Sequence, residues 1–220
     1  LRSSSAASDV YKRQAVLCSG NGSNFENIVR TCKNDEVVLM IHNKEKCGAA
    51  KRADKFGIPH SYIDSKNETN IIRLIQAWNV DLIVLAGWMR IVTKDFIDAF
   101  RGRIINVHPS LLPKYKGLHA IQQAMDAGET ETGATVHYVN EELDGGEIII
   151  QSKVPILHND DIKSLTKAIQ RREYAILPEA IKHVKSKLQE PNSGYMLQDD
   201  VYRWDGRIKR KDLDEQTLPT

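Results

Sequence analysis

Short apolar runs that alternate with segments of helical periodicity constrain the fold of this chain more than any other feature. The strongest run, VDLIVLA, covers residues 80–86 and has the length and composition of a buried strand. Similar runs lie at residues 14–19, 36–42, 59–63 and 103–107. Between the runs, apolar residues recur at helical spacing over residues 25–32, 47–56, 68–78 and 95–100. This alternation predicts parallel β-α-β units, and therefore an α/β, Rossmann-like, mostly parallel twisted sheet with flanking helices.

The next part of the chain departs from this alternation. Residues 120–127 have helical periodicity, whereas residues 134–139 and 147–154 are expected to be strands. The loop between these two strands, residues 140–146, has the length of a hairpin connection. The sequence therefore predicts an antiparallel C-terminal extension of the sheet.

The last third contains a long helical pattern and a weaker strand signal. Asp160 is expected to cap the long helix, and Pro178 to kink or restart it. Residues 195–209 alternate weakly around Asp205-Gly206, which indicates a small hairpin at the edge of the sheet.

Length, charge and cysteine content limit the classes of function. A chain of 220 residues can bury one sizeable core, and 31 basic against 29 acidic residues give no broad positive surface for nucleic acid. No apolar run approaches the roughly 20 residues that cross a bilayer. Cys18, Cys32 and Cys47 are odd in number and lack metal-ligand spacing. We therefore expect a cytoplasmic protein without a metal, a membrane or nucleic-acid partner, as a monomer or weak homodimer.

The two ends of the chain differ in composition from the rest. Residues 1–14 are rich in Ser and Ala and lack the apolar core of a secretory signal, so we expect a non-native or disordered leader. Residues 15–209 are expected to form a single domain. Residues 210–220 are expected to be a polar tail.

A glycine-rich loop follows the first predicted strand. It reads Gly20-Asn21-Gly22-Ser23-Asn24 and leads directly into a helical pattern. Backbone N–H groups in such a loop, together with the positive end of the helix, favour an anion such as phosphate. We expect glycine to be required at position 22, because the Cβ of any other residue would occupy the phosphate position. In the alternative interpretation, Ser23 and Asn24 are ordinary helix caps.

A second polar group lies at the end of the predicted strand 103–107. Asn106 and His108 alternate onto one face, and Pro109 then stops the strand. An amide that can donate to an oxyanion, beside an imidazole that can move a proton, can perform acyl transfer to an amine. The alternative is a structural asparagine and a histidine satisfied in the core. In parallel sheets ligands bind at the carboxyl ends of the strands, so residues 87–91 should lie beside the glycine loop.

Four segments together resemble the phosphoribosylglycinamide formyltransferases, a family of folate-dependent formyltransferases. They read SGNGSN at residues 19–24, LAGWMRI at 85–91, NVHPSLLPKY at 106–115 and ELDGG at 142–146. The resemblance extends from about residue 15 to about residue 209. It implies transfer of a formyl group from 10-formyltetrahydrofolate to glycinamide ribonucleotide in purine biosynthesis.

The resemblance also implies a role for each matching position. The catalytic positions correspond to Asn106, His108 and Asp144. The ribonucleotide would be bound by Gly22, Ser23, Asn24 and Glu173. The folate would be bound by Met89, Arg90, Ile91, Val92, Asn140, Glu141, Glu142 and Leu143, with Lys66 as a further basic contact.

Three alternatives are considered beside this function. Formyltetrahydrofolate hydrolase and methionyl-tRNA formyltransferase share much of the pattern, but each carries an extra domain for which we expect no room here. A non-catalytic nucleotide-binding domain would explain the glycine loop. It has no need of Asn106, His108 and Asp144 together.

Overall fold

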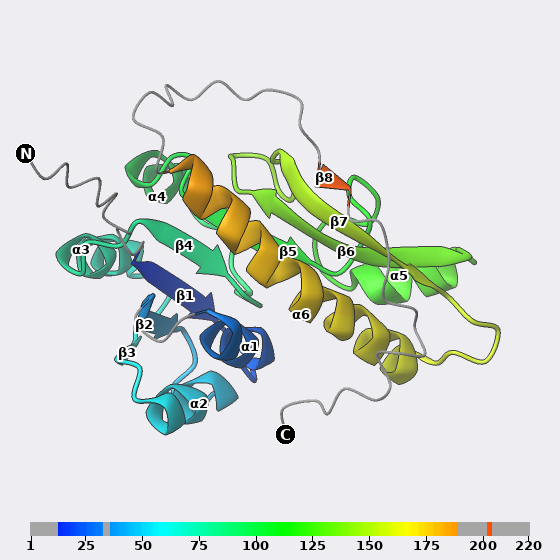
Figure 1. Ribbon diagram of the computed structural model, residues 1–220, viewed down its shortest axis with the longest axis horizontal. Coiled ribbons are helices and arrows are strands. Elements are labelled where there is room, and N and C mark those ends of the chain that lie inside the picture. The colour runs from blue at the N-terminus through cyan, green and yellow to red at the C-terminus, as the bar shows by residue number, and fades with distance from the viewer. Residues whose placement is uncertain (1–12, 33–35, 189–201, 204–220) are drawn as a thin grey trace, which may run out of the picture.

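The computed structural model describes residues 13–32, 36–188 and 202–203 and shows one mixed sheet flanked by helices (Figure 1). The strands are β1 (Gln14–Cys18), β2 (Val37–His42), β3 (His60–Tyr62), β4 (Leu82–Leu85), β5 (Ile104–His108), β6 (Glu131–Tyr138), β7 (Ile148–Pro155) and β8 (Tyr202–Arg203). The helices are α1 (Ser23–Thr31), α2 (Gly48–Phe56), α3 (Glu68–Ala77), α4 (Lys94–Ala99), α5 (Ala120–Asp126) and α6 (Ile162–Lys187).

The sheet has the order β3-β2-β1-β4-β5-β6-β7-β8. Strands β3 to β5 pair in parallel, β6 is antiparallel to both β5 and β7, and β8 is parallel to β7. The strand order reverses between β1 and β4, because the chain leaves β1 toward β2 and later returns on the other side. The predicted fold, a Rossmann-like sheet with an antiparallel C-terminal extension, is confirmed.

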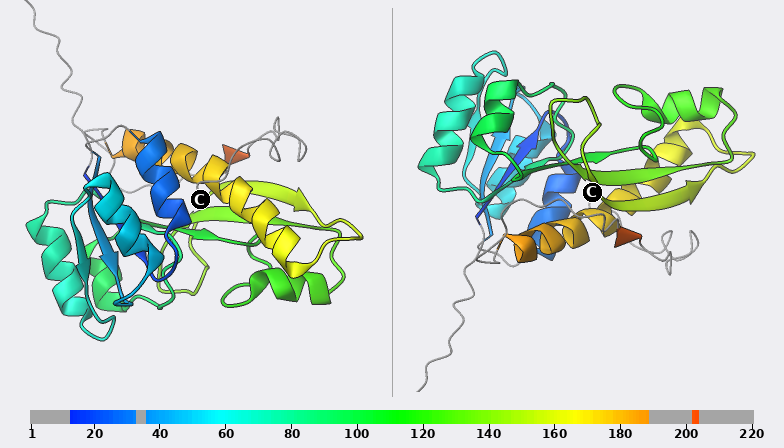
Figure 2. Two further views of the ribbon diagram at one scale, coloured as in Figure 1. Left: turned by 90° about the horizontal axis from the view of Figure 1, so that it is seen from below. Right: turned by 90° about the horizontal axis from the view of Figure 1, so that it is seen from above.

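Two apolar cores lie on opposite faces of the sheet. In β1, Val16 and Cys18 point into the core that α1, α2 and α6 cover, whereas Ala15 and Leu17 point into the core that α3 and α4 cover. Figure 2 shows these helices on the two sides of the sheet. A strand buried on both faces reads as a continuous apolar run, which is the pattern seen in the sequence.

Helix α6 differs from its predicted form in two respects. Its N-cap is Asp161, whose carboxylate accepts from the Ser164 N–H, and not Asp160 as expected. Asp160 instead accepts from the Leu157 N–H and the Ser164 hydroxyl, one residue before the cap. Of the kink or restart expected at Pro178, the restart does not occur, because the helix continues to Lys187 as one element.

Several predictions concern the ends of the chain. Gln14 belongs to β1, although we assigned it to the leader, and residues 1–12 lie outside the described part. Of the predicted hairpin at 195–209, only β8 is described, and the Asp205-Gly206 turn and the tail lie outside the described residues.

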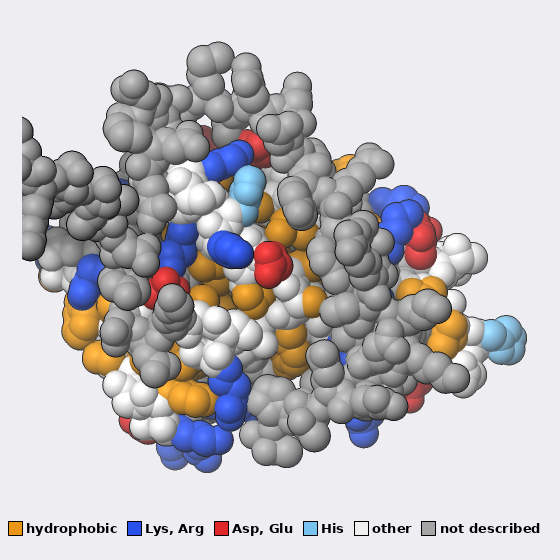
Figure 3. Space-filling model, viewed as in Figure 1, with side chains coloured by type: hydrophobic (Ala, Val, Ile, Leu, Met, Phe, Trp, Pro, Cys, Tyr) orange, Lys and Arg blue, Asp and Glu red, His pale blue; other side chains and the backbone are white. Residues whose placement is uncertain are grey.

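None of the helices in the described ranges has both the length and the hydropathy that a bilayer crossing requires. On the face in Figure 3, basic and acidic side chains are interspersed.

Candidate active site

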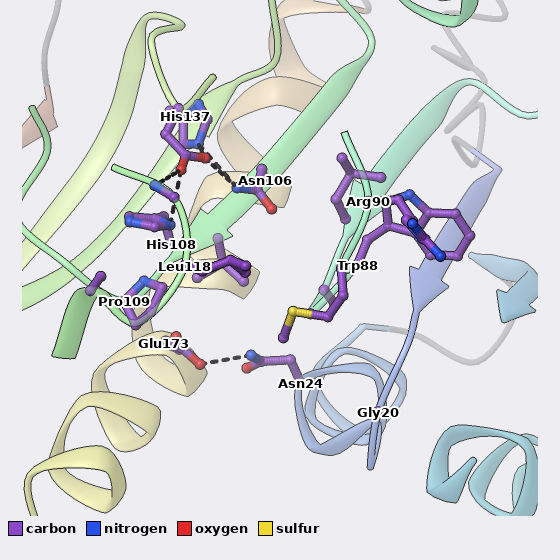
Figure 4. A pocket seen from close by; sticks show the side chains of 18 of the residues that line it. Gly20, Asn24, Trp88, Arg90, Asn106, His108, Pro109, Leu118, His137 and Glu173 are labelled. Atoms are coloured by element: carbon purple, nitrogen blue, oxygen red, sulfur yellow. Dashed lines mark hydrogen bonds and ion pairs between the residues drawn. The ribbon is translucent and has the colours of Figure 1, made fainter. Parts of the chain in front are cut away.

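A cavity of about 1160 Å³ opens at the carboxyl ends of the parallel strands. Its walls come from the loop after β1, the loop after β4, the end of β5, the loop after β6, and α6. Figure 4 shows Asn106, His108 and His137 gathered on one side, Trp88 and Arg90 on the other, and the Asn24–Glu173 contact below both groups. The cavity therefore lies at the point where the strand order reverses, as expected for an open α/β sheet.

The loops after β1 and β4 contact one another directly. The Ser19 N–H donates to the Gly87 carbonyl at 3.0 Å, and the Ser19 hydroxyl accepts from the Met89 N–H at 2.8 Å. Residues 20–24 and 87–91 both line the cavity. The predicted proximity of these two segments is confirmed.

Gly22 is required for a different reason from the one we expected. It is the N-cap of α1 with a φ of 76°, a left-handed conformation that favours glycine. A Cβ at this position would lie 2.6 Å from the Ala49 Cα on α2, so close packing of α2 excludes it. The expectation that this Cβ would occupy the phosphate position is therefore wrong. Ser23 and Asn24 are the first two helical residues and are not the cap.

The first turn of α1 supplies polar groups to the cavity. The N–H groups of residues 23–25 have no partner one turn earlier in the helix, which makes this end suitable for an anion. The Asn24 Nδ2 donates to the Glu173 Oε2 at 2.8 Å, while the Asn24 Oδ1 is buried without a hydrogen-bond partner. Burial raises the pKa of Glu173 to about 7, and the hydrogen bond from Asn24 opposes this shift. A ligand with a donor group would satisfy the Asn24 oxygen.

His108 is held by a backbone carbonyl on one side and by a carboxylate on the other. Its Nε2 lies 2.8 Å from the Tyr115 carbonyl, so this nitrogen carries a hydrogen and donates. Its Nδ1 lies 3.4 Å from the Asp144 Oδ2. Burial lowers the pKa of His108 below its ordinary value, although the Tyr115 carbonyl and Asp144 both oppose the shift and His137 adds to it. Asp144 thus acts in the direction expected, but burial outweighs it.

The Asp144 carboxylate contacts both other catalytic candidates, His108 and Asn106. Its Oδ2 accepts from the Gly117 N–H at 2.8 Å, and its Oδ1 lies 3.4 Å from the Asn106 Nδ2 and 3.6 Å from the His137 Nε2. Burial alone would raise the pKa of Asp144, but His137, the Gly117 N–H and the charge of His108 lower it to about 2. The carboxylate is therefore ionised at neutral pH.

His137 is a site residue that sequence reasoning missed. It lies opposite Asn106 in the β5–β6 register, is 2% exposed, and its Nδ1 donates to the Tyr138 carbonyl at 2.7 Å. In neutral His137 the Nε2 is then an acceptor, and it lies 3.1 Å from the Asn106 Nδ2. The Asn106 amide nitrogen therefore faces His137 and Asp144. In the sequence, His137 is visible as a histidine within the apolar run 134–139. Its position beside Asn106 follows only from the antiparallel register of β5 and β6.

The remaining predicted residues divide into two groups. Those predicted to bind folate line the cavity, with the exception of Lys66: Met89, Arg90, Ile91, Val92, Asn140, Glu141, Glu142 and Leu143. Lys66 is exposed in the connection between β3 and α3, where its N–H binds the Asp64 carboxylate, and it does not line the cavity. Glu68, two residues after Lys66, accepts from the Thr93 N–H, which adjoins the cavity residue Val92, so the folate contact of Lys66 stays a prediction.

The fold and this arrangement define a formyl transferase. The formyl transferase family model matches residues 12–181, and the chain belongs to this family. Among its relatives is the phosphoribosylglycinamide formyltransferase of Haemophilus influenzae, which is 42% identical over 182 residues covering 78% of this chain and 86% of the relative.

Two further comparisons agree with this assignment. The crystal structure of phosphoribosylglycinamide formyltransferase from Anaplasma phagocytophilum is similar with a TM-score of 0.77 and 36% identity, covering 80% of this chain and 88% of that one. The trifunctional purine biosynthetic protein adenosine-3 of Drosophila melanogaster is 44% identical over 183 residues, or 77% of this chain. The chain spans only 14% of the length of that relative.

Proposed function

We propose that this protein transfers the formyl group of 10-formyltetrahydrofolate to the amine of glycinamide ribonucleotide. The observation that carries the proposal is that Asn106, His108 and Asp144 line the same cavity as two chemically different surfaces. One end offers helix N–H groups and the other offers exposed apolar side chains. The names of the relatives described above support formyl transfer to glycinamide ribonucleotide.

The ribonucleotide end is formed by the first turn of α1 and by α6. Gly22, Ser23 and Asn24 would bind the phosphate at this end of α1, because the N–H groups of residues 23–25 have no partner one turn earlier and the positive helix end favours anions. Glu173 and the unsatisfied Asn24 oxygen would accept hydrogen bonds from the rest of the substrate.

The folate end is formed by the loops after β4 and β6, with Leu118 added from the loop after β5. Met89, Ile91, Leu118 and Leu143 are 60%, 75%, 67% and 47% exposed, which is unusual for large apolar side chains that line a cavity. A flat aromatic ring system would cover them, with hydrogen bonds to the loop backbone. These residues fit the donor substrate.

His108 can hold and release a proton at Nδ1. Because Nε2–H donates to Tyr115, the lone pair of a neutral His108 is on Nδ1 and faces the Asp144 carboxylate. Protonation at Nδ1 turns this contact into an ion pair, so the site favours imidazolium when charge develops on the substrate. We propose that the amine attacks the formyl carbon and that His108 then passes this proton to the folate nitrogen as the bond between that nitrogen and the formyl carbon breaks. The proton that the attacking amine loses returns to the His108 Nδ1 through a water ordered by Asp144, so the site ends in its starting protonation state.

Asn106 would stabilise the negative oxygen of the tetrahedral intermediate. Of its two contacts, the one to Asp144 at 3.4 Å is longer than the one to His137 at 3.1 Å. The N–H that faces Asp144 is therefore the weaker bond, and it can be redirected to the substrate oxygen. The contact with His137 keeps the amide in place meanwhile.

An absorbance assay for the folate product, with and without glycinamide ribonucleotide, tests the proposal. We expect product only when both substrates are present. Product without ribonucleotide would indicate the hydrolase, and formylation of initiator methionyl-tRNA would indicate the other formyltransferase. Consumption of neither substrate would leave a nucleotide-binding domain and contradict the proposal.

Hydrogen exchange tests the two ends separately. A folate analogue should protect the amides of residues 88–92 and 140–144, whereas the ribonucleotide should protect residues 20–24. If the folate analogue protected residues 20–24 and left residues 88–92 and 140–144 unprotected, the assignment of the two ends would be wrong.

A further inference from the structure

Helix α6 passes through Pro178 without a break, although proline removes a helix hydrogen bond. In a regular helix the N–H of residue 178 would donate to the Tyr174 carbonyl, and Pro178 has no N–H. The side chain of Asn27, on α1, donates to this carbonyl at 2.9 Å. A residue from another helix therefore supplies the donor that the proline lacks.

The next residue toward the N-terminus of α6 is Glu173, which lines the cavity. It accepts from Asn24, which lies three residues before Asn27 and therefore on the same face of α1. Two adjacent residues of α6 are thus bound by two side chains one helical turn apart on α1. Figure 4 shows the first of these contacts, between Asn24 and Glu173. Together these hydrogen bonds determine where α1 lies along α6.

We infer that Asn27 is a positioning residue for the ribonucleotide, an inference that rests on the proposed function. Asn27 does not line the cavity. It acts by fixing the first turn of α1, with its N–H groups and Asn24, at the correct distance from Glu173. The folate end is built from the loops after β4 and β6, which are not joined through this contact. Loss of Asn27 should therefore affect one substrate more than the other.

A purely structural role is the competing explanation. Without Asn27 the Tyr174 carbonyl loses a hydrogen bond, which would lower stability whatever happens at the site. The substitution Pro178→Ala separates the two roles, because residue 178 then has an N–H that can donate to Tyr174 within α6. It restores a partner to the carbonyl but does not restore the contact between α1 and α6.

The experiment measures Tm, kcat and both KM values in four forms of the full chain. They are the wild type, Asn27→Ala, Pro178→Ala and the double variant. Asn70→Ala, the same change at an exposed position of α3, is the matched control. For Asn27→Ala we expect the KM for ribonucleotide to rise about three- to tenfold, the usual effect of one lost hydrogen bond. The KM for folate should change less than about twofold and the Tm should fall by about 2–4 °C.

The double variant decides between the two roles. We expect its Tm to return toward that of Pro178→Ala while its KM for ribonucleotide stays raised. A KM that recovers together with the Tm would overturn the inference and leave Asn27 as a structural residue. An unchanged KM in Asn27→Ala, in an otherwise active enzyme, would also overturn it without affecting the proposed function. A wild type that transfers no formyl group would instead overturn the proposed function, and this inference with it.

Discussion

Replacing Asp144 with Asn should lower the pKa of His108 and shift the pH dependence of catalysis to lower pH. The substitution removes the charge but keeps the shape of the side chain. Asp144 has a φ of 46°, and asparagine tolerates this left-handed conformation better than alanine does. Asp144→Asn is therefore a cleaner test of the charge than Asp144→Ala, which would add backbone strain.

The distance between the two groups sets the size of the effect. The His108 Nδ1 and the Asp144 Oδ2 are 3.4 Å apart, and both side chains are less than 10% exposed (7% and 9%). With an effective dielectric constant of about 20, two unit charges at this distance attract by about 5 kcal/mol, an upper limit. Rearrangement of the site reduces this, and carboxylates this close typically shift a pKa by about one to three units.

The sign follows from the proton on Nδ1. Asp144 raises the pKa of His108 against the larger effect of burial, so removing the charge lowers that pKa further. At neutral pH a smaller fraction of His108 is then protonated. Turnover at pH 7 should fall by about ten- to a thousandfold if the step requires imidazolium, and it should recover partly at lower pH.

The assay combines NMR titration of labelled histidines with kcat and kcat/KM profiles. Asp54→Asn is the matched control, because Asp54 also faces a histidine, with its Oδ1 3.1 Å from the His60 Nε2, but does not line the cavity. It should leave the His108 titration and the rate profile unchanged. A His108 midpoint that stays the same or rises in Asp144→Asn would refute the reasoning.

Three further predictions follow from the same contacts. His108→Ala should lower turnover by about a hundredfold or more with little change in ribonucleotide binding, measured by calorimetry on the folded variant. The pKa of Glu173 is raised to about 7, so folding becomes less favourable as pH rises from about 4.5 to 7. Urea titrations at several pH values measure the free energy of unfolding, and Glu173→Gln should remove up to about 3 kcal/mol of its decrease between these pH values. A free energy of unfolding that falls equally with pH in Glu173→Gln and in the wild type would contradict this prediction. Arg52→Ala should destabilise by about 3 kcal/mol, because Arg52 pairs with the buried Glu26 carboxylate. Arg30→Ala should cost less, since Arg30 is 49% exposed and leaves that pair intact.

The sequence allowed the fold to be predicted because buried parallel strands leave a clear pattern. Residues 82–86 and 104–105 contribute apolar side chains to the cores on both faces of the sheet, and a short apolar run of this kind is typical of a buried parallel strand. Asn106 and His108 could be found for a related reason, since they are polar residues at the end of such a run. The family resemblance, which the match over residues 12–181 confirms, supplied the distant Asp144.

Contacts between elements could not be predicted in the same way. His137 is opposite Asn106 only because β5 and β6 pair in one particular antiparallel register. Gly22 is required by the approach of Ala49, which belongs to another helix. Lys66 was named from the family resemblance alone, and it does not line the cavity. Each depends on how two distant segments pack, which local periodicity does not contain.

The position of Asp144 shows why the antiparallel extension is needed for the site. The loop that carries it follows β6, which pairs with β5 and runs in the opposite direction, so the loop must fold back to reach His108. A Cβ on Gly146 would lie 1.7 Å from the Tyr138 carbonyl, and glycine is therefore required where the loop returns along β6. This return brings the carboxylate to the Gly117 N–H and to the Asn106 amide. A sheet that continued in parallel would send the next loop along the strand ends, without placing a carboxylate between an asparagine on β5 and a histidine on β6.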